Sequence, residues 1–160
     1  MKLISACLCG INCKYNGGNN MNPYYWALLR QGGFIPICPE QLGGLPTPRT
    51  ASEVVGGTGE DVINGNAQVF TRDGQDLTNS FLKGAQETLR IAIQTGIDGA
   101  ILQSRSPSCG HGKIYDGSFT GNLIDGNGVT VALLKKNDIK IWNDQDYLRE
   151  KGVCISIESS

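Results

Sequence analysis

The stretch DGAILQSRSPSCG, residues 98–110, holds the features that decide the fold. Its apolar run, Gly99–Leu102, is short and uninterrupted, which is typical of a strand buried on both faces in the centre of a parallel sheet. The polar segment Ser104–Gly110 follows directly and contains three serines, a proline and Cys109. The sequence therefore predicts a central strand that carries Cys109 in the loop at its carboxyl end.

Two further cysteines follow segments of the same kind. Lys2–Ala6 is predicted to be the first strand, and Cys7 comes directly after it. Phe34–Ile37 is predicted to be the second strand and is followed by Cys38 in a Cys-Pro-Glu sequence. Open α/β sheets bind their ligands beyond the carboxyl ends of the strands. We therefore expect Cys7, Cys38 and Cys109 to meet at one edge of the sheet.

Helical patterns alternate with these strands along the chain. The strongest lies at Asp76–Thr95, where apolar residues recur at three- and four-residue spacing. The segment Pro39–Gly65, rich in Gly, Pro and Thr, is predicted to be a loop. The remaining predicted elements are helices at Tyr24–Arg30 (after Asn22 and Pro23 as capping residues), Thr130–Lys136 and Asp144–Lys151, a strand at Ile139–Trp142, and a short strand or hairpin arm at Ala67–Thr71.

This alternation predicts the fold class. Strands that alternate with helices form a parallel sheet with helices on both faces. We expect a single-domain, three-layer α/β fold, Rossmann-like or flavodoxin-like, with a mostly parallel sheet and Gly-rich site loops at its carboxyl edge.

Composition narrows the class of protein. The 160-residue chain is 39% hydrophobic and 18% charged, which fits one globular domain, residues 1–160, and argues against disorder. The formal net charge of −1 provides no overall basic field to attract nucleic acid. Lys14, Arg49 and Arg105 lie in or near the predicted site loops, either as a local basic patch or as ordinary solvated charges.

Whether cysteines form disulfides or bind metals depends on the cellular compartment of the protein. No stretch approaches a membrane span, and the apolar segment after Lys2, Leu3–Ala6, is too short for a secretory signal. We therefore expect a cytoplasmic protein without a membrane partner. In a reducing cytosol the six cysteines are better explained as metal ligands or reactive thiols than as three disulfides.

The cysteine spacing favours one kind of metal centre over another. Structural zinc sites usually carry paired Cys-x₂-Cys ligands, and this chain has no such pair of pairs. Cys154, between Val153 and Ile155, is expected to be a buried structural residue. Cys38 and Cys109 lie in Pro- and Gly-containing turns, where a thiol is more reactive. Three dispersed thiolates fit an iron–sulfur cluster with one open iron better than they fit a zinc site. A zinc-stabilised structural domain is therefore ranked last among the alternatives.

Polar residues beside two of the cysteines suggest acid–base chemistry. Glu40 stands two residues after Cys38 and is predicted to act as a general base or proton shuttle; otherwise it caps a backbone N–H or pairs with Arg49. Ser106 and Ser108 flank Pro107 and either orient a substrate or water, or are ordinary turn residues.

Seven short motifs occur along the chain: residues 5–10 (SACLCG), 14–17 (KYNG), 38–40 (CPE), 43–49 (GGLPTPR), 81–85 (FLKGA), 106–110 (SPSCG) and 114–119 (IYDGSF). In this combination the chain resembles the DUF523 family, the family of thiouracil desulfurases, from its start to about Trp142. The resemblance implies a [4Fe-4S] cluster held by Cys7, Cys38 and Cys109, with the fourth iron free to take the sulfur of a thiolated substrate. It also implies catalytic roles for Glu40 and Ser106.

Three residues depart from the family pattern. Lys14 and Asn16 stand in Lys-Tyr-Asn-Gly where the family has Arg-Tyr-Asp-Gly, and Cys9 replaces a leucine. Loss of the guanidinium weakens bidentate recognition of a carboxylate or carbonyl, so the substrate is left open. Cys9 and Cys13 share a loop with Cys7, and either is an alternative ligand.

The expected function is that of an enzyme. A thiolated pyrimidine or a related thiocarbonyl would exchange its sulfur for oxygen without net redox change, the sulfur being captured by the open iron. Backbone N–H groups near Gly43, Gly44 and Gly110 are expected to face the substrate or cluster sulfurs. The partner is a small thiolated nucleobase or nucleoside, with a thiolated tRNA as an open alternative. The alternative function is a cluster-bearing sulfur carrier or redox sensor without turnover.

Overall fold

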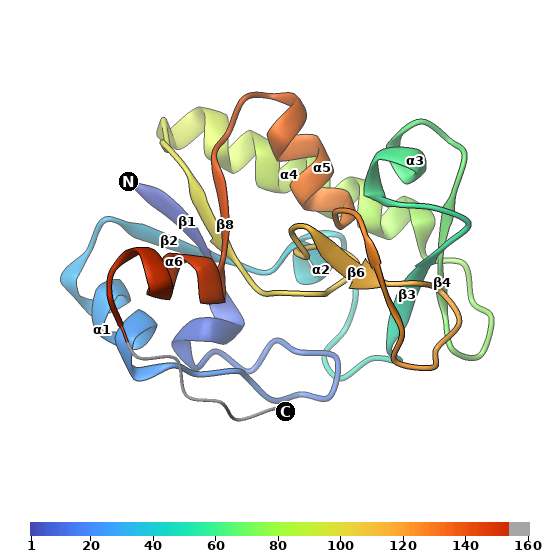
Figure 1. Cartoon of the computed structure of the whole chain (residues 1–160), viewed down its shortest axis with the longest axis horizontal. Helices are drawn as coiled ribbons and strands as arrows, with labels where there is room; N and C mark the ends of the chain where they lie inside the picture. The colour runs from blue at the N-terminus through green and yellow to red at the C-terminus, as the bar shows by residue number, and fades with distance from the viewer. Residues whose placement is uncertain (154–160) are drawn as a thin grey trace.

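Four parallel strands form the central sheet, in the order β2–β1–β5–β8 (Figure 1). The computed structural model describes residues 1–153, so the prediction for Cys154 lies outside the described residues. The predicted parallel sheet is confirmed. Its strands are β1 (Lys2–Ser5), β2 (Phe34–Ile37), β5 (Ala100–Leu102) and β8 (Ile141–Asn143).

The strand order of the sheet reverses between β1 and β5, because β2 is added on one side of β1 and β5 on the other. Lys2 pairs with Phe34 on one side of β1, and Leu3 pairs with Ala100 on the other. The chain therefore moves outward from β1 to β2, then crosses back to β5 and continues to β8. The loops after β1 and β5 diverge at this point, which is where doubly wound sheets form their ligand sites.

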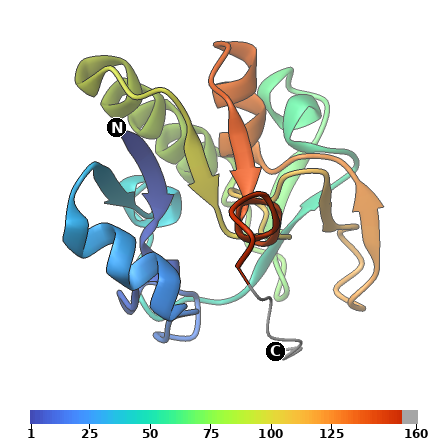
Figure 2. The same ribbon diagram turned by 60° about the vertical axis from the view of Figure 1, so that its left-hand side comes forward.

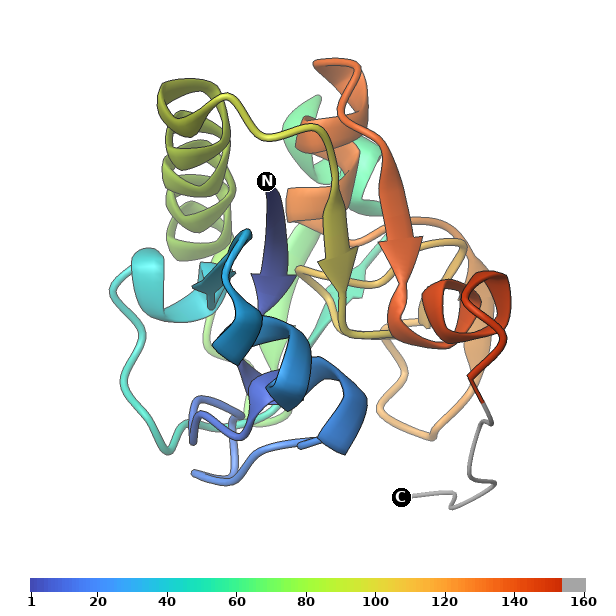
Figure 3. The same ribbon diagram turned by 90° about the vertical axis from the view of Figure 1, so that its left-hand side faces the viewer.

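Helices cover both faces of the sheet, as the alternation of elements predicts. Neighbouring residues Leu3 and Ile4 of β1 are both fully buried, because their side chains point to opposite faces. Figures 2 and 3 show the two helical layers on either side of the strands. One layer is α1 (Pro23–Gln31) with α6 (Asp144–Glu150), and the other is α4 (Thr78–Thr95) with α5 (Val129–Lys136).

Local signals in the sequence explain where the helices begin and end. The Asn22 side chain accepts a hydrogen bond from the Tyr24 N–H at 2.9 Å, and Pro23 occupies the first turn of α1. Helix α4 ends at Gly96, whose φ of 62° is left-handed. No helix among residues 1–153 combines the length and the apolar character needed to cross a membrane.

The prediction of a loop at Pro39–Gly65 is wrong. This segment contains α2 (Pro39–Leu42), β3 (Ser52–Val55) and α3 (Gly59–Ile63), and β3 pairs antiparallel with β4 (Gln68–Thr71). A second hairpin, β6 (Lys113–Tyr115) with β7 (Leu123–Asp125), also has no counterpart in the prediction. These short elements pack around the amino-terminal half of α4 beside the main sheet, through a third buried cluster that includes Val54, Val69, Phe81 and Ile114 (Figure 1).

Two glycines allow α2 to pack directly on α4. A Cβ atom on Gly84 would lie 2.0 Å from the Pro39 carbonyl oxygen, and one on Gly43 would lie 2.0 Å from the Ser80 carbonyl oxygen. Any side chain at either position would push the two backbones apart. This contact fixes the short helix that directly follows Cys38.

Gly84→Ala is expected to lower the free energy of unfolding by about 1–3 kcal/mol, because the new methyl group overpacks a backbone contact. Urea denaturation of the metal-free chain measures the loss. Gln86→Ala, at an exposed position of the same helix, is the control and should change stability by less than ~0.5 kcal/mol. Equal effects of the two substitutions would contradict the close approach of α2 and α4.

Candidate functional site

The three predicted cysteines lie in the loops at the carboxyl edge of the sheet. Cys7 is in the 3₁₀ turn η1 (Ala6–Cys9) directly after β1, Cys38 caps α2 directly after β2, and Cys109 is in the loop after β5. Cys7 Sγ lies 3.9 Å from Gln103 Oε1, which links the loops after β1 and β5. Cys38 and Cys109 are close enough for charge on one to disfavour charge on the other.

A fourth cysteine, Cys13, lies among them. Its thiol is within hydrogen-bonding reach of both Cys7 and Cys38, and its carbonyl oxygen lies 3.8 Å from Cys38 Sγ. Only 2% of Cys13 is exposed. Cys9 is not part of this group, since its Sγ lies 3.7 Å from the Tyr25 carbonyl oxygen in the core under α1. From the sequence, Cys13 is predicted only as an alternative ligand to Cys7. No sequence signal indicates that Cys13 lies beside Cys7 and Cys38 while Cys9 does not.

The surroundings of Cys38 and Cys109 raise the pKa of both thiols and so disfavour their ionised form in the metal-free chain. Burial raises the pKa of the Cys109 thiol to about 12, although Ser108 and Ser5 partly oppose this by hydrogen bonding. Two effects raise the pKa of the Cys38 thiol well above its ordinary value. The larger is a hydrogen bond with Cys13, and the smaller is burial. Binding of a cationic metal centre would supply the compensation that a buried thiolate requires.

Glu40 forms a buried ion pair with Arg49. Arg49 Nε lies 3.1 Å from Glu40 Oε1, and the two side chains are 6% and 15% exposed. A second guanidinium nitrogen donates to the Cys13 carbonyl oxygen at 2.8 Å. Arg49 is therefore an internal residue that bridges the Cys7–Cys13 loop and α2, and it is not part of a surface basic patch.

The two serines before Cys109 have different partners. Ser106 Oγ accepts a hydrogen bond from the Cys109 N–H at 2.7 Å. Ser108 Oγ donates to Glu40 Oε2 at 3.0 Å and lies 3.6 Å from Cys109 Sγ. The two hydroxyl oxygens are 3.3 Å apart. Ser108, which the sequence did not distinguish from an ordinary turn residue, is thus in direct contact with Glu40.

The start of α5 holds this serine loop in place. The Val129 N–H donates to the Pro107 carbonyl oxygen at 2.8 Å, and the Thr130 N–H donates to that of Ser108 at 3.0 Å. Gly128 permits the approach, since a Cβ atom there would lie 2.5 Å from the Ser108 carbonyl carbon. Backbone donors at the helix terminus therefore fix the loop and leave its side chains free to face the site.

The glycine N–H groups expected to face a substrate are used elsewhere. Gly43 N–H bonds to the Pro39 carbonyl oxygen and Gly44 N–H to that of Gln41, both at 2.9 Å. Gly110 N–H bonds to the Ser106 carbonyl oxygen at 3.0 Å. That prediction is wrong, because tight turns consume these donors.

Of the residues that depart from the family pattern, Lys14 is the one connected to the site. Lys14 Nζ donates to Asn20 Oδ1 at 2.8 Å, and Asn20 Nδ2 donates to Gln103 Oε1 at 3.0 Å. Gln103 in turn contacts Cys7. Asn16 instead accepts from the Gly18 N–H at 2.9 Å and shapes its own loop. Lys14 is therefore connected to the first cysteine through two amides.

The thiols do not form a site for one metal ion. The five cysteines within residues 1–153 are all free. In the same part of the chain, no three His, Cys, Asp or Glu side chains converge on a point that would hold a single ion. The predicted zinc alternative lacks its geometry in these residues.

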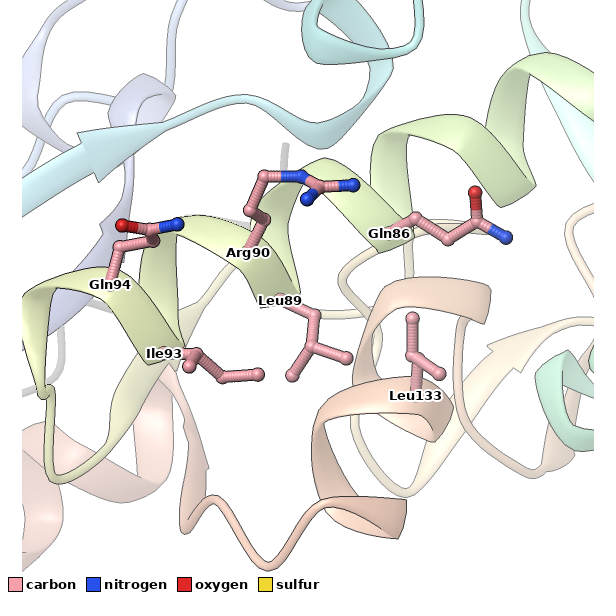
Figure 4. A pocket seen from close by; sticks show the side chains of 6 residues that line it. All are labelled: Gln86, Leu89, Arg90, Ile93, Gln94 and Leu133. Atoms are coloured by element: carbon pink, nitrogen blue, oxygen red, sulfur yellow. The ribbon is translucent and has the colours of Figure 1, made fainter.

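A groove elsewhere on the molecule offers no comparable chemistry. It has a volume of about 400 Å³ and lies between α4 and α5 (Figure 4). Its lining is apolar, amide and guanidinium: Gln86, Leu89, Arg90, Ile93, Gln94 and Leu133. The cysteine-bearing edge therefore remains the candidate site.

Comparison with known proteins agrees with this location. The family model for 2-thiouracil desulfurase matches residues 3–146. The chain belongs to the 2-thiouracil desulfurase family. This family span includes the loops that carry Cys7, Cys38 and Cys109, and it confirms the resemblance recognised in the sequence.

Two proteins similar to this chain illustrate how far the likeness extends. An uncharacterised protein of Bacillus subtilis (strain 168), YbbK, is 43% identical over 146 residues, which cover 91% of this chain and 97% of YbbK. The solved structure of the [4Fe-4S]-dependent thiouracil desulfidase TudS is 35% identical and has a TM-score of 0.79. It covers 95% of this chain and 98% of TudS. The likeness therefore concerns the whole fold and not a shared fragment.

Arg49→Met is expected to reduce the free energy of unfolding by roughly 3–5 kcal/mol, because it leaves the Glu40 carboxylate without its buried partner. Arg149→Met is the matched control. Arg149 pairs with Asp146 at 3.0 Å, with 62% and 51% of the side chains exposed, and should contribute less than ~1 kcal/mol. Urea denaturation of the metal-free chains measures both, and similar losses would contradict a special role for Arg49.

Proposed function

We propose that this chain is an iron–sulfur-dependent desulfurase that replaces the sulfur of a thiolated pyrimidine with oxygen. The observation that carries the proposal is the meeting, at one sheet edge, of thiols from three separate loops with the carboxylate of Glu40. Membership of the 2-thiouracil desulfurase family and the likeness to TudS support the same reaction.

The cofactor is a [4Fe-4S] cluster, and its proposed ligands are Cys7, Cys38 and Cys109. Thiolates are the ligands that iron–sulfur clusters require, and a cubane cluster binds each of them at a different iron. Such a cluster needs thiolates that surround it and do not meet at a single point. The thiols in residues 1–153 fit this requirement, since they do not converge on one ion. When bound, the cluster would supply an open iron that acts as a Lewis acid toward the substrate sulfur.

The reaction is a hydrolysis. Water and the C=S group give C=O and hydrogen sulfide, so no oxidant or reductant is consumed. Glu40 acts as the general base that takes a proton from the attacking water. Arg49 pairs with Glu40 and orients its carboxylate, and Ser106 holds the water or the substrate by a hydrogen bond.

The substrate class is a thiolated nucleobase or nucleoside. The net charge of −1 gives a long nucleic acid no overall attraction, so a small molecule is favoured. Turnover of 2-thiouracil, 4-thiouracil, their nucleosides and a thiolated tRNA distinguishes these possibilities. A chain that holds a cluster but converts none of them would instead be a sulfur carrier or redox sensor.

Anaerobic reconstitution with iron and sulfide should give about four iron atoms per chain and the absorbance of an iron–sulfur cluster. Cys109→Ala, Cys7→Ala and Cys38→Ala should each lose most of the bound iron, because each removes a ligand. Cys9→Ala is the matched control and should retain it, since Cys9 contacts the core under α1. Stoichiometric zinc without an iron–sulfur chromophore would contradict the proposed cofactor.

Glu40→Gln is expected to retain the cluster and lower turnover by about 10²–10⁴-fold, because the amide cannot accept the proton of water. Iron content and the rate of 2-thiouracil conversion are measured on the same preparation. Normal turnover in this variant would remove Glu40 from the mechanism while leaving the cofactor assignment intact.

A further inference from the structure

Hydrogen bonds beside Cys109 run in one direction and end at Glu40. The Cys109 N–H donates to Ser106 Oγ at 2.7 Å, and Ser108 Oγ donates to Glu40 Oε2 at 3.0 Å. A hydroxyl has one proton, and for that of Ser108 the Glu40 carboxylate oxygen at 3.0 Å is a nearer and stronger acceptor than Cys109 Sγ at 3.6 Å. The proton shared by the two serines, whose oxygens are 3.3 Å apart, therefore comes from Ser106.

The members of this chain of hydrogen bonds differ in their exposure to solvent. Ser108 is 2% exposed, whereas Ser106 is partly exposed. The other oxygen of Glu40 is occupied by Arg49 Nε. Ser106 is thus the end that a water molecule can reach, and Ser108 is the buried link to the carboxylate.

We propose that Ser108 relays a proton from Ser106 to Glu40. The inference rests on the proposed function. Water transfers a proton to Ser106 Oγ as its oxygen attacks the substrate carbon. Ser106 passes its own proton to Ser108, and Ser108 passes its own to Glu40 Oε2. Three protons each move one place, both serines end neutral and protonated, and no electron is transferred to or from the protein.

A purely structural role for Ser108 makes a different prediction. The backbone carbonyl of Ser108 receives the α5 donors, and Ser108→Ala keeps that carbonyl. The substitution removes only the hydroxyl, so the loop and the cluster ligands should stay in place. Loss of activity through the relay can therefore be separated from loss of structure.

The test compares Ser108→Ala and Ser106→Ala with wild type in single-turnover desulfuration of 2-thiouracil in mixtures of H₂O and D₂O. For wild type we expect a curved dependence of rate on deuterium fraction, because several protons move together. Ser108→Ala should keep full iron content and unchanged substrate affinity, lose about 10²-fold in rate, and show a linear dependence. The double variant should be no slower than either single variant, because the two residues act as one unit.

Ser104→Ala is the matched control. Ser104 lies on the same loop, but its hydroxyl bonds to Asp144 and not to Glu40. Its rate and its curved deuterium dependence should equal those of wild type. A linear dependence in wild type, an unchanged rate in Ser108→Ala, or a slower Ser108→Ala that keeps the curvature would each overturn the relay.

A measurement on the metal-free chain separates this inference from the proposed function. The infrared difference between wild type and Glu40→Gln isolates the Glu40 carboxylate band, and Ser108→Ala should shift that band by removing its donor. An unshifted band would refute the contact on which the relay depends. If the band shifts in the metal-free chain but the cluster-loaded chain desulfurates nothing, the contact stands. That result would refute the proposed function, and the relay with it.

Discussion

The buried ion pair between Arg49 and Glu40 connects the parts of the site. Arg49 reaches the loop after β1 through the Cys13 carbonyl, and Glu40 belongs to the helix that follows β2. The second oxygen of Glu40 is bound by Ser108 in the loop after β5. One carboxylate and one guanidinium thus join all three cysteine-bearing loops. The parallel sheet brings these loops to a common edge, but it does not set the orientation of their side chains.

Rigid backbone contacts support this arrangement from behind. Gly43 and Gly84 let α2 pack on α4 without intervening side chains, and Gly128 lets the serine loop approach the first turn of α5. These contacts are fixed by backbone shape and not by side chains that can change rotamer. The proposed site, with three cysteine ligands and a base, would benefit from such support, since small displacements of catalytic groups are costly.

The sequence predicts the sheet better than the site. Apolar runs and capping residues such as Asn22 and Gly96 are local signals, and they locate the central strands and main helices. Only one arm of the two hairpins is predicted, Ala67–Thr71, which is found as β4. The other three hairpin strands and α3 escape prediction because elements of three to five residues depend on partners distant in sequence, here around Phe81. Cys13 and Ser108 were underestimated for a related reason. Both lie in loops between regular elements, and the direction of a side chain in a loop depends on backbone contacts made elsewhere in the fold.

The order of the cysteines along the chain constrains how the protein matures. Cys7 and Cys38 emerge early during synthesis, but Cys109 follows only after the whole of α4 and β5. The strand that positions Cys109 lies next to β1 in space while being about a hundred residues away in sequence. If Cys7, Cys38 and Cys109 are the ligands, as proposed, the full set exists only after β5 has paired with β1. Insertion of the proposed cluster would then follow formation of the central sheet.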